Sequence, residues 1–265
     1  MRLYDLGDGI SIVPGYPFLY MSSYKKLILA DLHLGYEEAM AEEGIYLPKA
    51  QLTSIINDLR TVLEFLDVKN ILIVGDLKHR FDRLSKQERE EVSHFIKTLR
   101  EYGVDMIDLV KGNHDNFISI VLKKLDVRIS DHIIIGDILF IHGHQDPFEN
   151  KADTETDLSR VRVVVYGHEH PSIVLRDRLG KVAKLPVFLE IPLNLREDSK
   201  VRGIVLPASG YYQLGSPATL DPDKYLSPIT RRYAQTQHVK PYALIKGDTV
   251  LEMPTLATLM EFIEI

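Results

Sequence analysis

Five short segments of this chain concentrate side chains that bind metal ions or transfer protons. Each combines carboxylate, amide or imidazole groups, and four of the five contain a glycine. The segments are Asp31-Leu32-His33, Gly75-Asp76, Gly112-Asn113-His114-Asp115, His142-Gly143-His144 and Gly167-His168-Glu169-His170. Because the chain has no cysteine, only oxygen and nitrogen side chains are left to bind a metal, and thiol chemistry is excluded.

Taken one at a time, these segments also fit ordinary turns. The 31–33 segment fits a surface turn or helix cap, Gly75-Asp76 fits an Asx-turn, and the 167–170 segment fits an exposed loop. All five, however, follow apolar runs that are typical of buried strands. In α/β sheets, functional sites assemble at the carboxyl ends of strands, so the order of the segments favours one shared site.

The apolar runs and the stretches between them predict the elements that position these residues. Strands are expected at 26–30, 71–74, 106–110, 133–141 and 161–166. Residues 48–66 have helical apolar spacing, with Pro48 suited to the helix start. A second helix is indicated by Ser85-Lys86-Gln87-Glu88, which has the form of a capping box, and Gly103 can end it. These helices make two βαβ crossovers.

The later part of the chain is richer in strands than in helices. Strands are expected at 182–191, 201–206 and 242–251, separated by turns such as Gly247-Asp248. Residues Ser209 to Arg232 are rich in Pro and Gly and either gate the site or form an interface. The whole pattern fits an α/β fold with two mixed β-sheets packed face to face and flanked by helices.

Composition limits the class of protein. With 265 residues, 45% of them hydrophobic, we expect one domain over 1–265. The net charge is −6 and the pI about 5.9, so a broad basic footprint for nucleic acid is absent. The N-terminal stretch carries Asp5 and Asp8, and no long apolar run occurs, which predicts a cytoplasmic protein with no membrane association. The sequence does not predict an oligomeric state.

Together, the motifs D-x-H, G-D, G-N-H-[DE], H-G-H and G-H-x-H resemble the calcineurin-like metallophosphoesterase superfamily, over roughly residues 27–171. The resemblance implies a four-layer metallophosphoesterase sandwich. It also implies two metal sites that share Asp76, and a catalytic histidine, His114, that is not a ligand. The implied ligands are Asp31, His33, Asp76 and His170 for one metal, and Asp76, Asn113, His142 and His168 for the other.

The donor set also favours particular cofactors. Carboxylate, amide and imidazole ligands suit Mn²⁺, Fe²⁺, Ni²⁺ or Zn²⁺ better than Mg²⁺, and two Mn²⁺ ions are our working choice. Such ions acidify water and neutralise phosphate oxygens, which suits hydrolysis of a phosphate ester. His114 can then protonate the leaving alkoxide. Further substrate contacts are expected from Asn113, His79, His144 and Arg80. Lys78 and Arg83 also follow Asp76 closely enough to touch substrate phosphates, although such charges are more often simply solvated.

A narrower resemblance concerns the substrate. Residues 75–79 (Gly-Asp-Leu-Lys-His), the 142–144 segment and Leu226-Ser227-Pro228 are similar to the ICC-like phosphoesterases, whose genes often accompany those of DNA ligase or large helicases. This implies a nuclease or nucleotide phosphodiesterase acting on DNA or RNA, with a possible helicase or ligase partner. Two alternatives remain: a phosphomonoesterase or nucleotide hydrolase, and a non-catalytic, metal-stabilised scaffold for a helicase or repair partner.

The chain departs from the superfamily pattern at one position. The pattern G-D-x-x-D has a second Asp that commonly orients the catalytic histidine, and here His79 takes its place. Either His79 packs beside the metal site or it lies in the pocket within reach of His114, and we predict the latter. Asp115, Asp82 or another carboxylate would have to replace the missing one. In the 142–144 segment, the pattern implies His142 as the ligand, with His144 lining the pocket.

Overall fold

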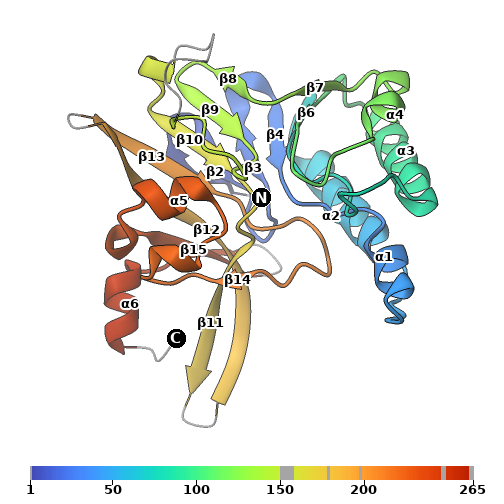
Figure 1. The fold of residues 1–265 in the computed structure, drawn as a ribbon. Helices are drawn as coiled ribbons and strands as arrows, with labels where there is room; N and C mark the ends of the chain where they lie inside the picture. The colour runs from blue at the N-terminus through green and yellow to red at the C-terminus, as the bar shows by residue number, and fades with distance from the viewer. Residues whose placement is uncertain (1, 150–157, 178–179, 197–198, 246–248, 263–265) are drawn as a thin grey trace.

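The structure, a computed structural model, describes residues 2–149, 158–177, 180–196, 199–245 and 249–262 (Figure 1). Within these residues, two mixed β-sheets lie face to face and carry helices on their outer faces. The predicted turn at Gly247-Asp248 lies outside the described residues. None of the helices in the described part of the chain is long and apolar enough to cross a membrane.

The first sheet comes from the N-terminal half of the chain. Its strands lie in chain order: β1 (Tyr4–Gly7), β2 (Ile10–Ile12), β3 (Leu19–Met21), β4 (Lys26–Leu29), β5 (Asn70–Val74), β6 (Met106–Val110) and β7 (Arg128–Ser130). Pairing is antiparallel from β1 to β4 and parallel from β4 to β7. Parallel neighbours need long crossovers. These contain α1 (Tyr36–Glu42), α2 (Gln51–Phe65), α3 (Lys86–Glu101) and α4 (Ser119–Lys124).

The second sheet has the strand order β14-β11-β12-β13-β10-β9-β8, and β15 and β16 branch from β12. The bounds are β8 (Ile133–Ile135), β9 (Ile138–Ile141), β10 (Val163–Tyr166), β11 (Pro171–Asp177), β12 (Gly180–Arg196), β13 (Ser199–Val205), β14 (Ser216–Pro217), β15 (Lys240–Ile245) and β16 (Thr249–Glu252). β10 lies between β9 and β13 and is parallel to both. β11 and the first half of β12 project from the body of the molecule (Figure 1).

Alternation along the strands creates the layers. In β4, Leu27 belongs to a core that includes side chains of α2 and α3, whereas Ile28 belongs to a core shared with the second sheet. In β10, Val165 faces the first sheet, and Val164 belongs to a third core that reaches α5 (Pro228–Tyr233) and α6 (Leu256–Phe262). Successive side chains of one strand thus point to opposite faces of the sheet and pack into different cores. The cores lie between layers of helix, sheet, sheet and helix, which confirms the predicted four-layer sandwich.

The second predicted crossover helix, α3, begins with the predicted capping box. The Ser85 hydroxyl accepts the Glu88 N–H at 3.2 Å, and the Glu88 carboxylate accepts the Ser85 N–H at 2.7 Å, so the capping box is complete. The helix ends at Glu101, and Gly103 follows in the left-handed conformation with φ of 85°. Glu88 also accepts the Arg80 N–H at 2.6 Å, so this helix start is joined to the loop that follows β5.

Several boundaries differ from the predictions. The apolar run 133–141 is a hairpin of β8 and β9 rather than one strand, because Gly136 adopts φ of 65° and reverses the chain. α2 begins at Gln51, three residues after Pro48, and β1 to β3 were not predicted. Single-turn 3₁₀ helices are η1 (Ser22–Tyr24), η2 (Leu158–Arg160), η3 (Pro222–Lys224) and η4 (Thr236–His238).

Candidate metal centre

The five chemical segments meet where the two sheets present the carboxyl ends of their strands. The 31–33, 75–76 and 112–115 segments follow β4, β5 and β6 of the first sheet, and the 142–144 and 167–170 segments follow β9 and β10 of the second. The two sets are in contact. His142 Nε2 lies 3.2 Å from Asp76 Oδ2, and His170 Nε2 lies 3.3 Å from Asp31 Oδ1.

An unusual backbone turns these side chains towards one another. Non-glycine residues rarely adopt positive φ, and strained backbone of this kind concentrates at functional sites. Five of the predicted ligands have φ between 45° and 68°: Asp31, His33, Asp76, His168 and His170. Backbone hydrogen bonds hold the first turns in place, since Asp31 N–H donates to Gly75 O and His33 N–H donates to Asp76 O, both at 3.0 Å.

Glycines before the ligands make room for this packing. A Cβ atom on Gly75 would lie 2.1 Å from His142 Nδ1. A Cβ on Gly112 would lie 2.2 Å from Asp76 Oδ1, and a Cβ on Gly167 would lie 2.6 Å from Asp31 Oδ2. At these positions any side chain would displace a predicted ligand.

The first ligand group consists of Asp31, His33, Asp76 and His170. Donor atoms of Asp31, His33 and His170 all lie within 4.8 Å of one another. His33 Nε2 lies 3.3 Å from His170 Nε2 and 3.8 Å from Asp76 Oδ2. Side chains with such converging donor atoms fit one divalent cation.

The second ligand group consists of Asp76, Asn113, His142 and His168. Donor atoms of Asp76, His142 and His168 lie within 4.8 Å of one another, and Asn113 Oδ1 lies 3.2 Å from His142 Nε2. Asp76 therefore stands between both groups, in the place expected for a shared ligand. That these side chains bind metal remains a prediction.

The protonation properties of the donors fit cation binding. Burial lowers the pKa of His168 to about 4, which leaves its ring neutral and a nitrogen lone pair free. Burial also lowers the pKa of His142, but the carboxylates of Asp76 and Asp31 outweigh burial and raise it to about 9. A proton on His142 thus partly balances the buried negative charge, and a bound cation would replace it. His142 Nδ1 faces Val74 O at 3.0 Å, which orients Nε2 towards Asp76.

The candidate general acid, His114, is fixed at the edge of this centre. Its backbone N–H donates to Asp76 Oδ1 at 3.0 Å, and its ring Nδ1 bonds to the backbone carbonyl of His79. The ring Nε2 lies 3.9 Å from Asp76 Oδ2, and 22% of the side chain is exposed. Because Nδ1 is engaged by the His79 carbonyl, Nε2 is the ring nitrogen that faces the ligand groups.

Asp115 does not replace the missing carboxylate. Its side chain is buried and accepts the backbone N–H groups of Asp76, Leu77 and Gly112 at 2.8–2.9 Å. Burial and the neighbouring Asp76 raise the pKa of Asp115 to about 6. Asp115 holds the turn that carries Asp76, and the carbonyl of His79 bonds His114 where a carboxylate was expected.

His79 lies beside His114. The two rings stack with centroids 5.5 Å apart, and His79 Nδ1 lies 3.3 Å from His33 Nδ1. Burial and the neighbouring His114 lower the pKa of His79 to about 4, so the ring is neutral at neutral pH. His144 is also in the centre, with its ring 5.3 Å from that of His142. Its Nδ1 is buried and has no hydrogen-bond partner among the described residues.

The basic residues after Asp76 are less available than expected. Lys78 is fully buried, and its ammonium donates to the carbonyls of Arg80 and Arg83. The prediction that Lys78 contacts the substrate directly is therefore wrong. The Arg80 guanidinium pairs with Glu42 and Asp82, and Arg83 pairs with Glu42 at 2.6 Å. Asp82 is thus engaged by arginines and does not orient His114.

Sequence reasoning missed residues that brace the ligand turns from outside. Fully buried Gln51 donates to Leu32 O at 2.6 Å and accepts the Tyr212 N–H at 3.0 Å. Buried Glu169 accepts the N–H groups of Leu226 and Ser227 at 2.8 and 2.9 Å. Ser209 to Arg232 therefore contains segments packed against the centre. Only Leu226-Ser227-Pro228 gave a sequence signal.

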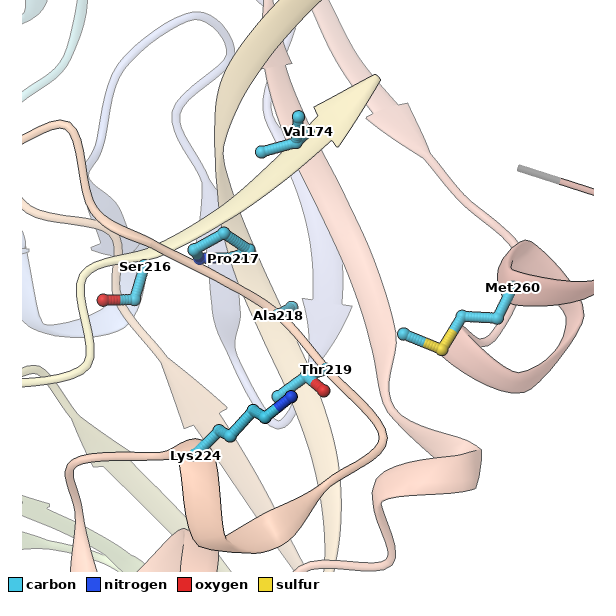
Figure 2. A pocket seen from close by; sticks show the side chains of 7 residues that line it. All are labelled: Val174, Ser216, Pro217, Ala218, Thr219, Lys224 and Met260. Carbon is cyan, nitrogen blue, oxygen red and sulfur yellow. The ribbon is translucent and has the colours of Figure 1, made fainter. Parts of the chain in front are cut away.

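A separate pocket of about 430 Å³ lies at the edge of the second sheet (Figure 2). Lys224, on η3, and Met260, on α6, extend towards it from different elements (Figure 2). The described residues that line it are Val174, Ser216, Pro217, Ala218, Thr219, Lys224 and Met260, and none of these is a predicted site residue.

This site has two groups of carboxylate, amide and imidazole donors that share one aspartate. The groups lie at the strand ends of a four-layer sandwich. This combination defines the class of metal-dependent phosphoesterases. Comparison with known families agrees. The chain belongs to the calcineurin-like phosphoesterase family, whose sequence pattern matches residues 24–172. It is a metal-dependent phosphoesterase, a hydrolase.

A solved structure shares the fold. Nuclease MPE of Pseudomonas putida superposes with a TM-score of 0.61 at 20% identity, covering 91% of this chain and 96% of that chain. A predicted phosphoesterase of Streptococcus pneumoniae has a TM-score of 0.33 and 14% identity, covering 85% of this chain and 91% of that chain. No curated protein matches the chain. The narrower resemblance to the ICC-like phosphoesterases remains a prediction.

Proposed function

We propose that this enzyme hydrolyses phosphodiesters, that its physiological substrate is a nucleic acid or a nucleotide, and that it works with two Mn²⁺ ions. The observation that carries the proposal is the position of His114. Its Nδ1 is anchored on a backbone carbonyl, and its Nε2 faces the shared ligand Asp76. A fixed imidazole beside a phosphate-binding centre is what an alkoxide leaving group requires, because an alkoxide leaves only with a proton.

The residues of this chain have separate tasks in such a reaction. When bound, divalent ions supply positive charge for the phosphate oxygens and acidify water. Asp31 and Asp76 balance that charge only in part, so the centre attracts an anionic phosphate despite the net charge of −6. With Nδ1–H donating to the His79 carbonyl, His114 can hold a proton on Nε2 and deliver it to the leaving oxygen.

The similarity to a nuclease supports the part of the proposal that names a nucleic acid as substrate. At 20% identity, this similarity is one of fold. A second candidate is hydrolysis of phosphomonoesters or nucleotides, since the ligand groups would serve either ester. A non-catalytic scaffold for a helicase or repair partner is less well supported, because a scaffold has no use for an anchored general acid.

The test pairs a chromogenic diester, bis(p-nitrophenyl) phosphate, with its monoester, p-nitrophenyl phosphate, in the presence of Mn²⁺. Single-stranded, duplex and flap oligonucleotides are then compared with mononucleotides. We expect faster turnover of the diester and cleavage of oligonucleotides, and Asp76→Ala serves as the inactive control. Preferential hydrolysis of the monoester would overturn the diesterase proposal.

A further inference from the structure

Aromatic side chains continue the catalytic centre onto the surface around His114. The His114 ring lies 6.0 Å from that of Phe81. From His79, which stacks on His114, further rings follow one another to Tyr36, Tyr212 and Tyr211, with centroid distances of 4.8, 5.7 and 5.1 Å. We call Phe81, Tyr36, Tyr212 and Tyr211 the aromatic row.

The aromatic row is not part of the hydrophobic interior. None of its members belongs to the three cores formed by the described residues. At its two ends, Phe81 is 64% exposed and Tyr211 is 56% exposed. Large apolar rings in water beside a catalytic centre indicate a surface that a ligand covers.

Hydrogen bonds outside the ring faces hold the chain at Phe81 and Tyr212, and Tyr36 and Tyr212 also stack on one another. The Phe81 carbonyl accepts the side-chain amide of Asn116 at 3.3 Å, which joins its loop to the one that carries His114. Tyr212 is fixed by its N–H to Gln51 and by its hydroxyl to the carbonyl of Pro48. A platform already ordered before binding loses little entropy when it binds.

Charge around the aromatic row favours a ligand that binds through flat groups rather than through many phosphates. The nearby guanidinium groups of Arg80 and Arg83 are paired with Glu42 and Asp82. Duplex DNA is held mainly by contacts of free Lys and Arg with its phosphates. Single strands also contact basic residues, but they gain further affinity from bases stacked on aromatic side chains, and this stacking works only when the bases are unpaired.

We propose that the aromatic row stacks unpaired nucleobases next to the scissile phosphate, one on Phe81 and others on Tyr36, Tyr212 and Tyr211. The aromatic row thus determines specificity for a single-stranded polynucleotide. This inference rests on the proposed function, because the bases must be attached to a phosphodiester that reaches the ligand groups.

The test measures binding of a short, fluorescently labelled, single-stranded oligonucleotide to the full, Mn²⁺-loaded chain by anisotropy. Phosphorothioate linkages slow its cleavage, and a gel checks that it stays intact. Phe81→Ala and Tyr211→Ala are compared with Phe65→Ala, a change at a ring that is 62% exposed at the end of α2. We expect the first two changes to weaken binding roughly 5- to 150-fold each, as for loss of one stacked base, and the third to leave binding unchanged.

An abasic oligonucleotide of the same length identifies the bases as the cause. Wild-type protein should bind it more weakly than either variant binds the intact strand, because every stacked base is missing, and Phe81→Ala and Tyr211→Ala should then have little further effect. The inference would be overturned if the two Ala changes weakened binding equally on the abasic and the intact strands. It would also be overturned if the protein bound duplex as tightly as the single strand. Hydrolysis of bis(p-nitrophenyl) phosphate by wild-type protein is measured in parallel. If this hydrolysis is absent while binding still depends on the bases, the proposed function is rejected, but the role of the aromatic row in base stacking is not.

Discussion

At the scale of single residues, the account depends on which nitrogen atoms face the centre. His114 is anchored through Nδ1 and presents Nε2, and His142 is anchored at Val74 O and presents Nε2 to Asp76. A second partner on each imidazole fixes the ring orientation, as is common at metal centres. The effect of substituting each histidine therefore depends on whether it is a ligand or a proton donor.

Replacement of His114 by Ala should leave the metal content near normal and lower the rate on a diester with an alkoxide leaving group by about 10²–10⁴-fold. The reason is that His114 contributes a proton rather than a bond to the metal. A diester with a phenolate leaving group should lose less, because phenolate leaves without a proton. If both substrates lose the same factor, His114 is not the proton donor.

Replacement of His79 by Asn should lower the rate more than the metal affinity. The His79 ring contacts both His33 and His114, but it is not a member of either ligand group. Rates over neutral and mildly alkaline pH, together with a metal titration, check this. An unchanged rate over that whole range would show that the ring merely fills space.

His142→Ala should lose more metal affinity than His144→Ala. His142 is 1% exposed and lies 3.2 Å from Asp76, whereas His144 Nδ1 contacts no hydrogen-bond partner among the described residues. Metal titration of the two variants compares them directly. A larger loss for His144→Ala would reverse the assignment of the ligand.

At the scale of elements, glycines at the strand ends let turns from two sheets meet. Gly75→Ala should cost about 1–2 kcal/mol of stability for its positive φ and should also displace His142, since the new Cβ would lie 2.1 Å from its ring. Gly44→Ala is a matched control, because Gly44 has φ of 81° and no atom within 4 Å of the added Cβ.

Both glycine variants should melt at lower temperature, but only Gly75→Ala should lose metal and activity. Thermal melts and elemental analysis of the two purified variants separate strain from displacement. Equal metal content in both variants would mean that the turn at Gly75 adapts without moving His142.

The elements also show what sequence can and cannot predict. Strand runs and the capping box at Ser85 were predictable because apolar alternation and helix capping are local signals. The break of 133–141 at Gly136 was missed because a single glycine inside an apolar run is ambiguous. The braces at Gln51 and Glu169 were missed because their partners lie far along the chain, at Tyr212 and Ser227.

At the scale of the whole molecule, the centre joins the two sheets. The first sheet supplies Asp31, His33, Asp76 and Asn113, and the second supplies the three remaining imidazoles, so neither sheet holds a complete ligand group. The convergence was predicted from the rule that sites form at strand ends. The face-to-face placement of the sheets depends on the core between them, in which side chains such as Ile28 and Val165 pack together.

The most direct test of the central claim is the metal content of active protein. Elemental analysis of anaerobically purified, fully active enzyme should find two transition-metal ions per chain, because two ligand groups share Asp76. Asp76→Ala should lose both ions and all activity, since it removes the carboxylate that lies between the groups. A fully active preparation that holds less than one equivalent of any transition metal would contradict the dinuclear account.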